Sequence, residues 1–92
     1  MSEWQDRRTE SRQAAAGVIR LRQTGLPAAP FHGRLIDSAP HGFRARHSRL
    51  SIASGQLVEF DGEDRCGLAR VVWTRIVDGE AETGFHVVGP DP

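Results

Sequence analysis

Short apolar segments alternate with turn-forming residues along this 92-residue chain. The segments are rich in β-branched and aromatic residues, and each is bounded by glycine, proline, serine or aspartate. This pattern is typical of β-strands, and no long amphipathic helix is expected after residue 16. We expect six strands, at residues 18–22, 31–36, 43–47, 57–60, 68–76 and 84–88.

Turn signals between these segments indicate how the strands connect. Asp78-Gly79 follows the longest predicted strand, and both residues tolerate a positive φ, so the last two strands are expected to form a hairpin. Asp61-Gly62 predicts a turn, and the two prolines within residues 26–30 predict a loop. Six short strands must close or stack to cover their edges. The pattern therefore predicts an all-β domain, a small six-stranded antiparallel β-barrel.

The segment before the first predicted strand has a different character. Residues 6–12 contain no apolar side chain and cannot form part of a core. Residues 13–16 have helix propensity, so a turn of helix starting near Asp6 would place Arg8 and Arg12 on one face. Taken alone, such an Arg-x-x-x-Arg pattern indicates only a solvated helix face. We expect three parts, a flexible N-terminal segment at residues 1–16, the barrel at 17–88 and a C-terminal tail at 89–92.

Size and composition exclude several classes of protein. Ninety-two residues allow one modest core, and an apolar fraction of 38% with a charged fraction of 26% is ordinary for a folded domain. No apolar run is long enough to cross a bilayer, and the N-terminus is too polar for a secretory signal, so a cytoplasmic protein is expected. Cys66 is the only cysteine and the four histidines lack ligand spacing, so no disulfide, metal or cofactor is expected. No nucleophile with a base and no carboxylate pair is visible, so we do not expect an enzyme.

The formal net charge of zero conceals an asymmetry between the two halves of the chain. Residues 1–50 hold nine arginines and four acids, near +5, whereas residues 51–92 hold three arginines and eight acids, near −5. Every basic residue is arginine, which suits bidentate recognition of phosphate or of guanine edges. A genome rich in arginine codons explains the missing lysine more simply. The composition therefore favours an anionic ligand for the first half without deciding the matter.

Two motifs stand in order within this framework. They are Arg7-Arg8-x-x-x-Arg12 before the first predicted strand and Asp37-x-Ala39-x-x-Gly42 after the second. Together they resemble the signature of PilZ domains, bacterial β-barrel receptors for cyclic di-GMP: paired arginines, then Asp or Asn, x, Ser or Ala, x, x, Gly. Residues 55–60, 69–75 and 83–85 are similar to later strands of that barrel, so the resemblance covers nearly the whole chain.

The resemblance implies a ligand with two guanines and two phosphates. Arginine can fork onto a phosphate or onto guanine O6 and N7 and can stack on a purine, and these roles carry over to Arg7, Arg8 and Arg12. Asp37 would accept the guanine N1 and N2 protons, and Gly42 would allow a positive φ or a close approach of backbone to ligand. The alternatives are an ordinary turn cap for Asp37 and an ordinary turn glycine for Gly42.

The sequence departs from the commonest PilZ pattern in three places. Ala39 lacks the hydroxyl of the more usual serine, which could weaken binding by about 0.5–1.5 kcal/mol. Pro40 and His41 fill the variable positions, and His41 is expected to be an exposed turn residue more often than a ligand contact. The chain ends soon after the last predicted strand, so no long C-terminal helix is expected across the barrel. A partner or a second copy would then cover that end.

Two tryptophans are secondary candidates for contact with the ligand. In some PilZ domains a large residue near the position of Trp73 packs on a guanine. Strict alternation places Ala69, Val71, Trp73 and Arg75 on one face of the strand, and core packing of Trp73 is the preferred interpretation over stacking. Trp4 precedes the arginines and could fold over a bound ligand.

The expected function is that of a bacterial cyclic di-GMP receptor or adaptor, in outputs such as motility, polysaccharide export or biofilm formation. The ligand would order the N-terminal arginines against the barrel and so relay the signal to a downstream protein, with no membrane partner and a monomer or homodimer as the working state. One alternative is a PilZ-like protein-interaction adaptor without nucleotide binding, favoured by Ala39 and the missing helix. Another is a small barrel for single-stranded nucleic acid, opposed by the zero net charge and the scarcity of aromatics.

Overall fold

The computed structural model describes residues 13–25 and 29–89, and all regular structure in these ranges is β-strand. Strand burial alternates clearly where one face meets the core, as in β2, whose second, fourth and sixth residues are buried. The strands are β1 (Gln13–Ala14), β2 (Val18–Gln23), β3 (Phe31–Ala39), β4 (Gly42–His47), β5 (Leu57–Asp61), β6 (Cys66–Val77) and β7 (Glu80–Gly89).

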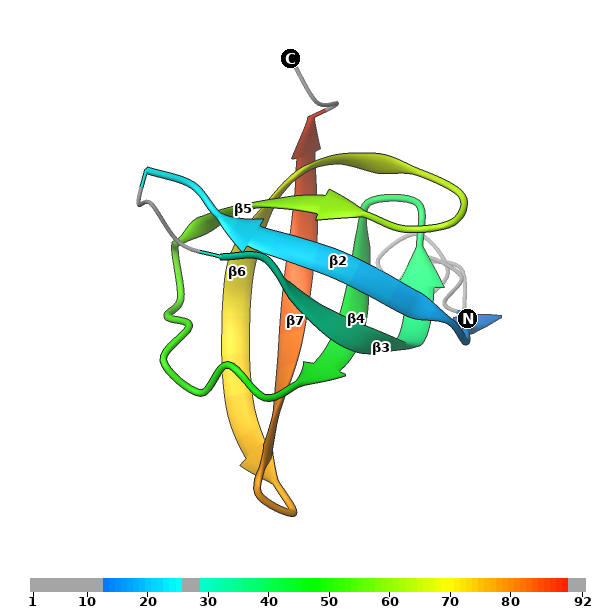
Figure 1. The fold of residues 1–92 in the computed structure, drawn as a ribbon. Helices are drawn as coiled ribbons and strands as arrows, with labels where there is room; N and C mark the ends of the chain where they lie inside the picture. Colours follow the sequence, from blue (N-terminus) through cyan, green and yellow to red (C-terminus); the bar gives the residue numbers. More distant parts are fainter. Residues whose placement is uncertain (1–12, 26–28, 90–92) are drawn as a thin grey trace, which may run out of the picture.

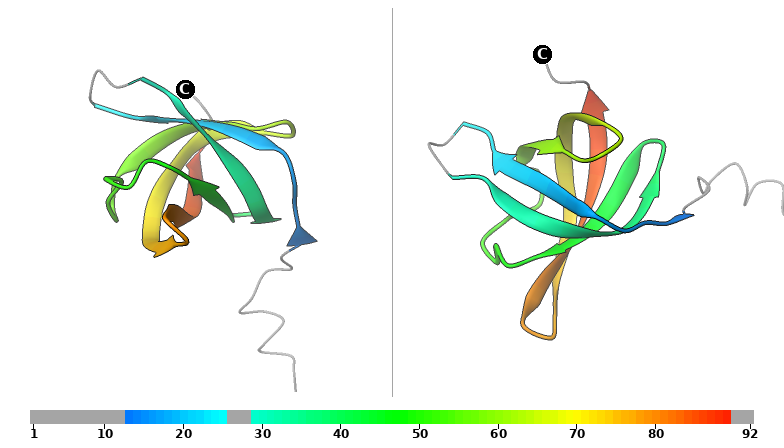
Figure 2. Two further views of the ribbon diagram at one scale, coloured as in Figure 1. Left: turned by 60° about the horizontal axis from the view of Figure 1, so that its bottom comes forward. Right: turned by 45° about the vertical axis from the view of Figure 1, so that its right-hand side comes forward.

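Six of these strands close into an antiparallel barrel (Figures 1 and 2). Around the barrel the order is β2, β3, β4, β7, β6 and β5, and β5 pairs again with β2. Closure leaves none of these six strands with a fully unpaired edge, which is why a chain of short strands adopts it. The predicted six-stranded antiparallel barrel is confirmed, and β1 is an additional short strand on β3.

The barrel interior is filled by side chains from every one of its six strands. Phe43 lies with its ring centroid 5.0 Å from that of Phe60 and 4.8 Å from that of Phe85. These aromatic contacts join β4, β5 and β7 across the interior, and each pair adds to the free energy gained from burial. The buried cluster comprises Ile19, Leu21, Phe31, Phe43, Ala45, Ile52, Val58, Phe60, Ala69, Val71 and Phe85.

A polar group of side chains lies inside the same barrel. His47 Nε2 lies 2.7 Å from Thr83 Oγ1, which lies 3.0 Å from Thr74 Oγ1. The backbone N–H of Arg49 donates to His47 Nδ1 at 3.1 Å, so the ring proton belongs on Nε2 and points to Thr83. Burial, and next the charge of Arg49, lowers the pKa of His47 below its ordinary value. The imidazole is therefore held neutral as a structural group.

The tight turn between β6 and β7 is formed by two residues of types that favour it. Asp78 and Gly79 join β6 to β7 with φ values of 53° and 81°, as a two-residue hairpin of positive φ requires. The predicted hairpin of the last two strands is confirmed, and it projects beyond the barrel (Figure 1). The last strand begins at residue 80, earlier than the predicted 84, because the turn needs only two residues.

The turn between β3 and β4 is shorter than the sequence indicated. Residues 37–39 continue β3 and Gly42 already belongs to β4, so Pro40 and His41 alone form the turn. The alternative of an ordinary turn cap for Asp37 is therefore wrong, since Asp37 lies near the end of β3. Pro40 has the fixed φ that suits the first turn position, and no donor is lost there because turn N–H groups lie outside the ladder.

The N-terminal boundary also differs from the expected one. Gln13 pairs with Ser38 and Ala14 with Asp37, so these residues form a strand, although they belong to the segment expected to be flexible and their helix propensity allowed a turn of helix. The reason is that β3 extends past the end of β2 and offers backbone groups that β1 can satisfy. Gly17, with φ of 116°, turns the chain from β1 into β2.

Two β-bulges change which side chains of the predicted site face outward. In β3 the pairing with β4 shifts at Ile36, so Leu35 faces the core and Asp37 faces outward. In β6 the pairing with β7 shifts at Val72, so Val71 is buried in the core while Trp73 is not part of it. The predicted strict alternation along β6, and with it the preferred core position of Trp73, is wrong beyond Val71. Nothing helical in the described ranges is long and apolar enough to span a membrane.

Candidate functional site

Four residues line up across four neighbouring strands on the outer face of the barrel. Asp37 on β3 pairs in register with Arg44 on β4, Arg44 pairs with Gly84 on β7, and Gly84 pairs with Trp73 on β6. Directly paired residues of antiparallel strands point to the same side of the sheet. We call Asp37, Arg44, Gly84 and Trp73 the outer row. It joins the predicted Asp37 motif to Trp73, residues that are 36 positions apart in the sequence.

Asp37 is already engaged by an arginine. Arg44 donates from Nε and Nη2 to Asp37 Oδ2, at 2.7 and 2.5 Å. Asp37 is only 7% exposed, and a carboxylate buried to this extent requires such a partner. The hydrogen bond to Asp37 raises the pKa of Arg44 above its ordinary value. The pair fixes the orientation of both side chains.

Glu82 is the centre of a larger ion-pair network beside the outer row. Arg44 Nη1, Arg46 Nη2 and Arg75 Nη2 each donate to its carboxylate at 3.2 Å. Burial alone would raise the pKa of Glu82, but the hydrogen bonds from Arg46 and Arg75 and the charges of Arg75 and Arg44 outweigh it, so the pKa lies below its ordinary value. Glu82 is only 3% exposed, but the surrounding arginines keep its carboxylate ionised.

Trp73 lies directly on a glycine of the neighbouring strand. A Cβ atom added to Gly84 would lie 2.5 Å from both Trp73 Cε2 and Nε1, so the indole occupies the place of a side chain at position 84. Arg75 Cζ lies 5.7 Å from the centre of the Trp73 ring, within the range of a cation–π contact. The indole is half-buried, which leaves part of it accessible at the outer surface.

Ala39 and Gly42 face each other at the ends of β3 and β4, on either side of the two-residue turn. Both are buried. Gly42 does not have a positive φ, so of the two roles suggested for this glycine the left-handed conformation is wrong and the close approach to a ligand stays a prediction. His41 is exposed in the turn, as expected.

Arg65, which the sequence did not single out, holds this turn from the loop between β5 and β6. Its guanidinium donates to the carbonyl oxygens of Pro40 and Ala39 at 2.7 Å each and of Gly42 at 3.2 Å. It also donates to Ser38 Oγ at 3.2 Å. No local signal marks this arginine, because its four acceptors lie 23 to 27 residues earlier in the chain.

The N-terminal motif residues Arg7, Arg8 and Arg12, together with Trp4, lie outside the described residues. Arg12 directly precedes Gln13 in the sequence, and Gln13 pairs with Ser38. The polypeptide therefore enters the described fold beside the Asp37 motif.

Ion pairs between strands partly neutralise the charge asymmetry of the sequence. Arginines of the first half contact acids of the second half, as in the Arg34 Nη2 to Glu80 Oε1 pair at 3.1 Å. Arg22 forms a similar pair with Glu59 on the other side of the barrel. The expected concentration of positive charge in the first half is thus partly cancelled by folding, although arginines still surround the outer row.

No family model matches the chain, and no curated protein matches it significantly. The site must therefore be interpreted from its own geometry. Arginines with fixed geometry, a partly exposed aromatic surface and a carboxylate can bind an anionic, aromatic ligand.

Proposed function

We propose that this protein is a cyclic di-GMP receptor of the PilZ type, with the ligand bound on the outer row. The observation that carries the proposal is the alignment of Asp37, Arg44, Gly84 and Trp73 on one outer face. The six-stranded barrel and the order of the two sequence motifs support it. None of these features requires catalysis, and the proposed role is recognition of a second messenger.

Each member of the site has a distinct role in this proposal. Trp73 supplies a flat surface on which a guanine stacks, and Arg75 lies next to it. Arg7, Arg8 and Arg12 contribute forked donors for the phosphates and for guanine O6 and N7. On binding, this N-terminal segment becomes ordered against the barrel and changes the surface that a downstream protein meets.

Asp37 carries the guanine-reading role, and its present contacts set a condition on that role. Arg44 already donates two hydrogen bonds to Oδ2 of this carboxylate. A guanine that donates its N1 and N2 protons to Asp37 must therefore share the carboxylate with this structural ion pair. The same observation favours the alternative of a PilZ-like adaptor that has lost the nucleotide, in which Asp37 and Arg44 only join β3 to β4. A binding measurement separates the two functions.

Isothermal titration calorimetry with cyclic di-GMP and with cyclic di-AMP is the direct test. We expect saturable binding of cyclic di-GMP and binding of cyclic di-AMP weaker by about 1–3 kcal/mol for each guanine edge that is read. Equal affinities would refute guanine reading by Asp37. Absence of binding to either dinucleotide would favour the adaptor function, and strong binding to single-stranded DNA would favour the nucleic-acid barrel.

Two further measurements locate the ligand. Trp73→Ala should weaken binding by about 1–3 kcal/mol, the range for stacking of a base on an aromatic side chain. Arg22→Ala is the matched control, because Arg22 is an ion-paired arginine on β2, away from the outer row. Trypsin should cut after Arg7, Arg8 and Arg12 more slowly at saturating cyclic di-GMP, and an unchanged rate would show that the barrel alone holds the ligand.

A further inference from the structure

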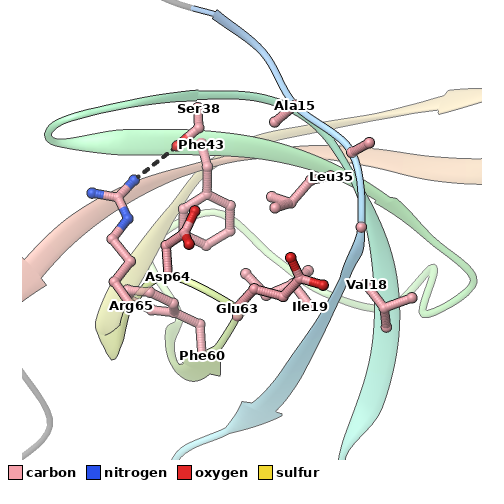
Figure 3. A pocket seen from close by; sticks show the side chains of 13 residues that line it. Ala15, Val18, Ile19, Leu35, Ser38, Phe43, Phe60, Glu63, Asp64 and Arg65 are labelled. Carbon is pink, nitrogen blue, oxygen red and sulfur yellow. Dashed lines mark hydrogen bonds between the residues drawn. The ribbon is translucent and has the colours of Figure 1, made fainter.

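A pocket opens on the inner side of the strands whose outer side carries the Asp37 motif (Figure 3). Its volume is about 90 Å³. Ser38 and Phe43 pair in register and face inward toward this pocket, whereas Asp37 and Arg44, one position away, face outward. The pocket is therefore separate from the proposed nucleotide site, although both share β3 and β4.

The floor of the pocket is apolar. Phe43, Phe60 and Ile19 are core residues whose atoms also line the pocket, and Leu35 packs against the same core. Val18 extends this apolar surface to the rim, where it is 56% exposed. Larger cavities of about 150 Å³ with such linings can hold benzene, so a volume near 90 Å³ suits one smaller aliphatic group.

The rim of the pocket carries two carboxylates that form no ion pair with the residues that the structure describes. Glu63 and Asp64 lie at the rim in the loop between β5 and β6, both are exposed, and within the described ranges neither forms an ion pair. Arg65 also lines the pocket, but its guanidinium is committed to the turn formed by Pro40 and His41 and its flanking residues. Two carboxylates against the one guanidinium of Arg65 leave the rim with a net negative charge, so it attracts a cation next to an apolar floor and repels an anionic dinucleotide.

We propose that this pocket is a docking site for a partner protein, which inserts one aliphatic side chain and pairs an adjacent lysine or arginine with Glu63 and Asp64. A free aliphatic molecule would bind too weakly, because each buried CH₂ group contributes only about 0.8 kcal/mol. A protein segment adds contacts with Val18 and with the two carboxylates. This proposal stands whether or not cyclic di-GMP binds the outer row.

The test is a titration of the full-length ¹⁵N-labelled protein with capped dipeptides, followed by NMR chemical shifts. Acetyl-leucyl-arginine amide at millimolar concentration should shift the resonances of Ile19, Leu35, Phe43 and Phe60. Acetyl-glycyl-arginine amide should bind at least about tenfold more weakly, because it lacks the apolar side chain. Acetyl-leucyl-glutamate amide should also bind more weakly, because its charge is repelled.

Variants of residues that line the pocket complete the test. Glu63→Gln and Asp64→Asn should each weaken the leucyl-arginine peptide about twofold to fivefold, as expected for exposed ion pairs, whereas Asp61→Asn, just outside the pocket, should not. Gly62→Leu should block the pocket without unfolding the barrel, since a Cβ at Gly62 would make only ordinary contacts, 3.6 Å from Arg65 O and 3.8 Å from Ile19.

Several outcomes would overturn the proposal. Equal shifts with all three peptides, or shifts only near Trp73, would show that the pocket does not select its occupant. Concentration-dependent shifts of the pocket resonances without peptide would show that a second copy of the chain fills it. The same shifts caused by Trp4→Ala alone would show that the N-terminal segment of this chain is the occupant.

Discussion

The contact between Trp73 and Gly84 gives a sharp prediction about the outer face. Gly84→Ala adds one methyl group that would lie 2.5 Å from Trp73 Cε2 and Nε1 and 2.9 Å from Cζ2. Non-bonded carbon atoms prefer a separation of about 3.5–4.0 Å, so the indole must move away by roughly 1 Å or more. The substitution therefore tests whether the tryptophan rests on this glycine in solution.

The expected magnitude comes from two opposing effects. Overpacking of this kind lowers the free energy of unfolding by about 1–3 kcal/mol. Replacing a strand glycine by alanine, in contrast, contributes about 0.5–1 kcal/mol of stability through backbone entropy. In a Trp73→Ala background only the second effect remains, so Gly84→Ala should become stabilising. The coupling free energy between the two positions should thus be about 1–3 kcal/mol.

Urea unfolding followed by circular dichroism measures all four proteins of this double-mutant cycle. In a Trp4→Phe background, where Trp73 is the only tryptophan, the emission of the Gly84→Ala variant should also move to longer wavelength. If Gly84→Ala changes stability equally with and without the indole, Trp73 does not rest on Gly84. The outer row would then lack a fixed aromatic surface, and the proposed stacking role would lose its structural basis.

Three further predictions concern the polar groups of the barrel. The pKa of His47 in the folded protein lies below its ordinary value of 6.5, so on lowering the pH the unfolded chain binds a proton at this imidazole before the folded chain does. The free energy of unfolding should therefore fall as the pH is lowered through 6.5. Urea unfolding between pH 7.5 and 5 should show this fall, and His47→Gln should lessen it. Arg65→Ala should lower the free energy of unfolding by about 1.5–3 kcal/mol and accelerate amide hydrogen exchange in β4 near the turn. Arg65→Lys should recover only part of this stability, because an ammonium group cannot fork onto several carbonyl oxygens, and unchanged exchange would show that Arg65 does not hold the turn. Glu82→Gln should lower the free energy of unfolding by more than about 1 kcal/mol, because three arginines lose the carboxylate with which they pair, and an unchanged urea midpoint would refute this.

The strands and the overall architecture could be predicted from the sequence because their signals are local. β-branched and aromatic runs locate the strands, and Asp78-Gly79 specifies a turn by its tolerance of positive φ. The need to cover the edges of six short strands then favours closure. These arguments require no knowledge of which strand lies next to which.

The orientation of the site residues could not be predicted, because it depends on pairing between strands. One extra residue at Ile36 and another at Val72 reverse the alternation, and so bring Asp37 and Trp73 to the same outer face. The position of a bulge depends on how a strand pairs with its partner, and neither Ile36 nor Val72 differs in type from an ordinary strand residue. The hydrogen bonds of Arg65 were missed for a similar reason, since its acceptors are distant in the chain.

The ion pairs of the barrel decide where the charge for an anionic ligand must come from. Of the nine arginines in the first half of the sequence, Arg22, Arg34, Arg44 and Arg46 pair with carboxylates of the second half. A guanidinium already bound to a carboxylate must share or lose that contact before it can bind a phosphate, and this lowers the net gain in binding free energy. The arginines that precede Gln13 belong to a segment with no apolar side chain between residues 6 and 12. In the proposed receptor, the barrel therefore provides mainly the oriented surface for the bases, and Arg7, Arg8 and Arg12 provide most of the charge for the phosphates.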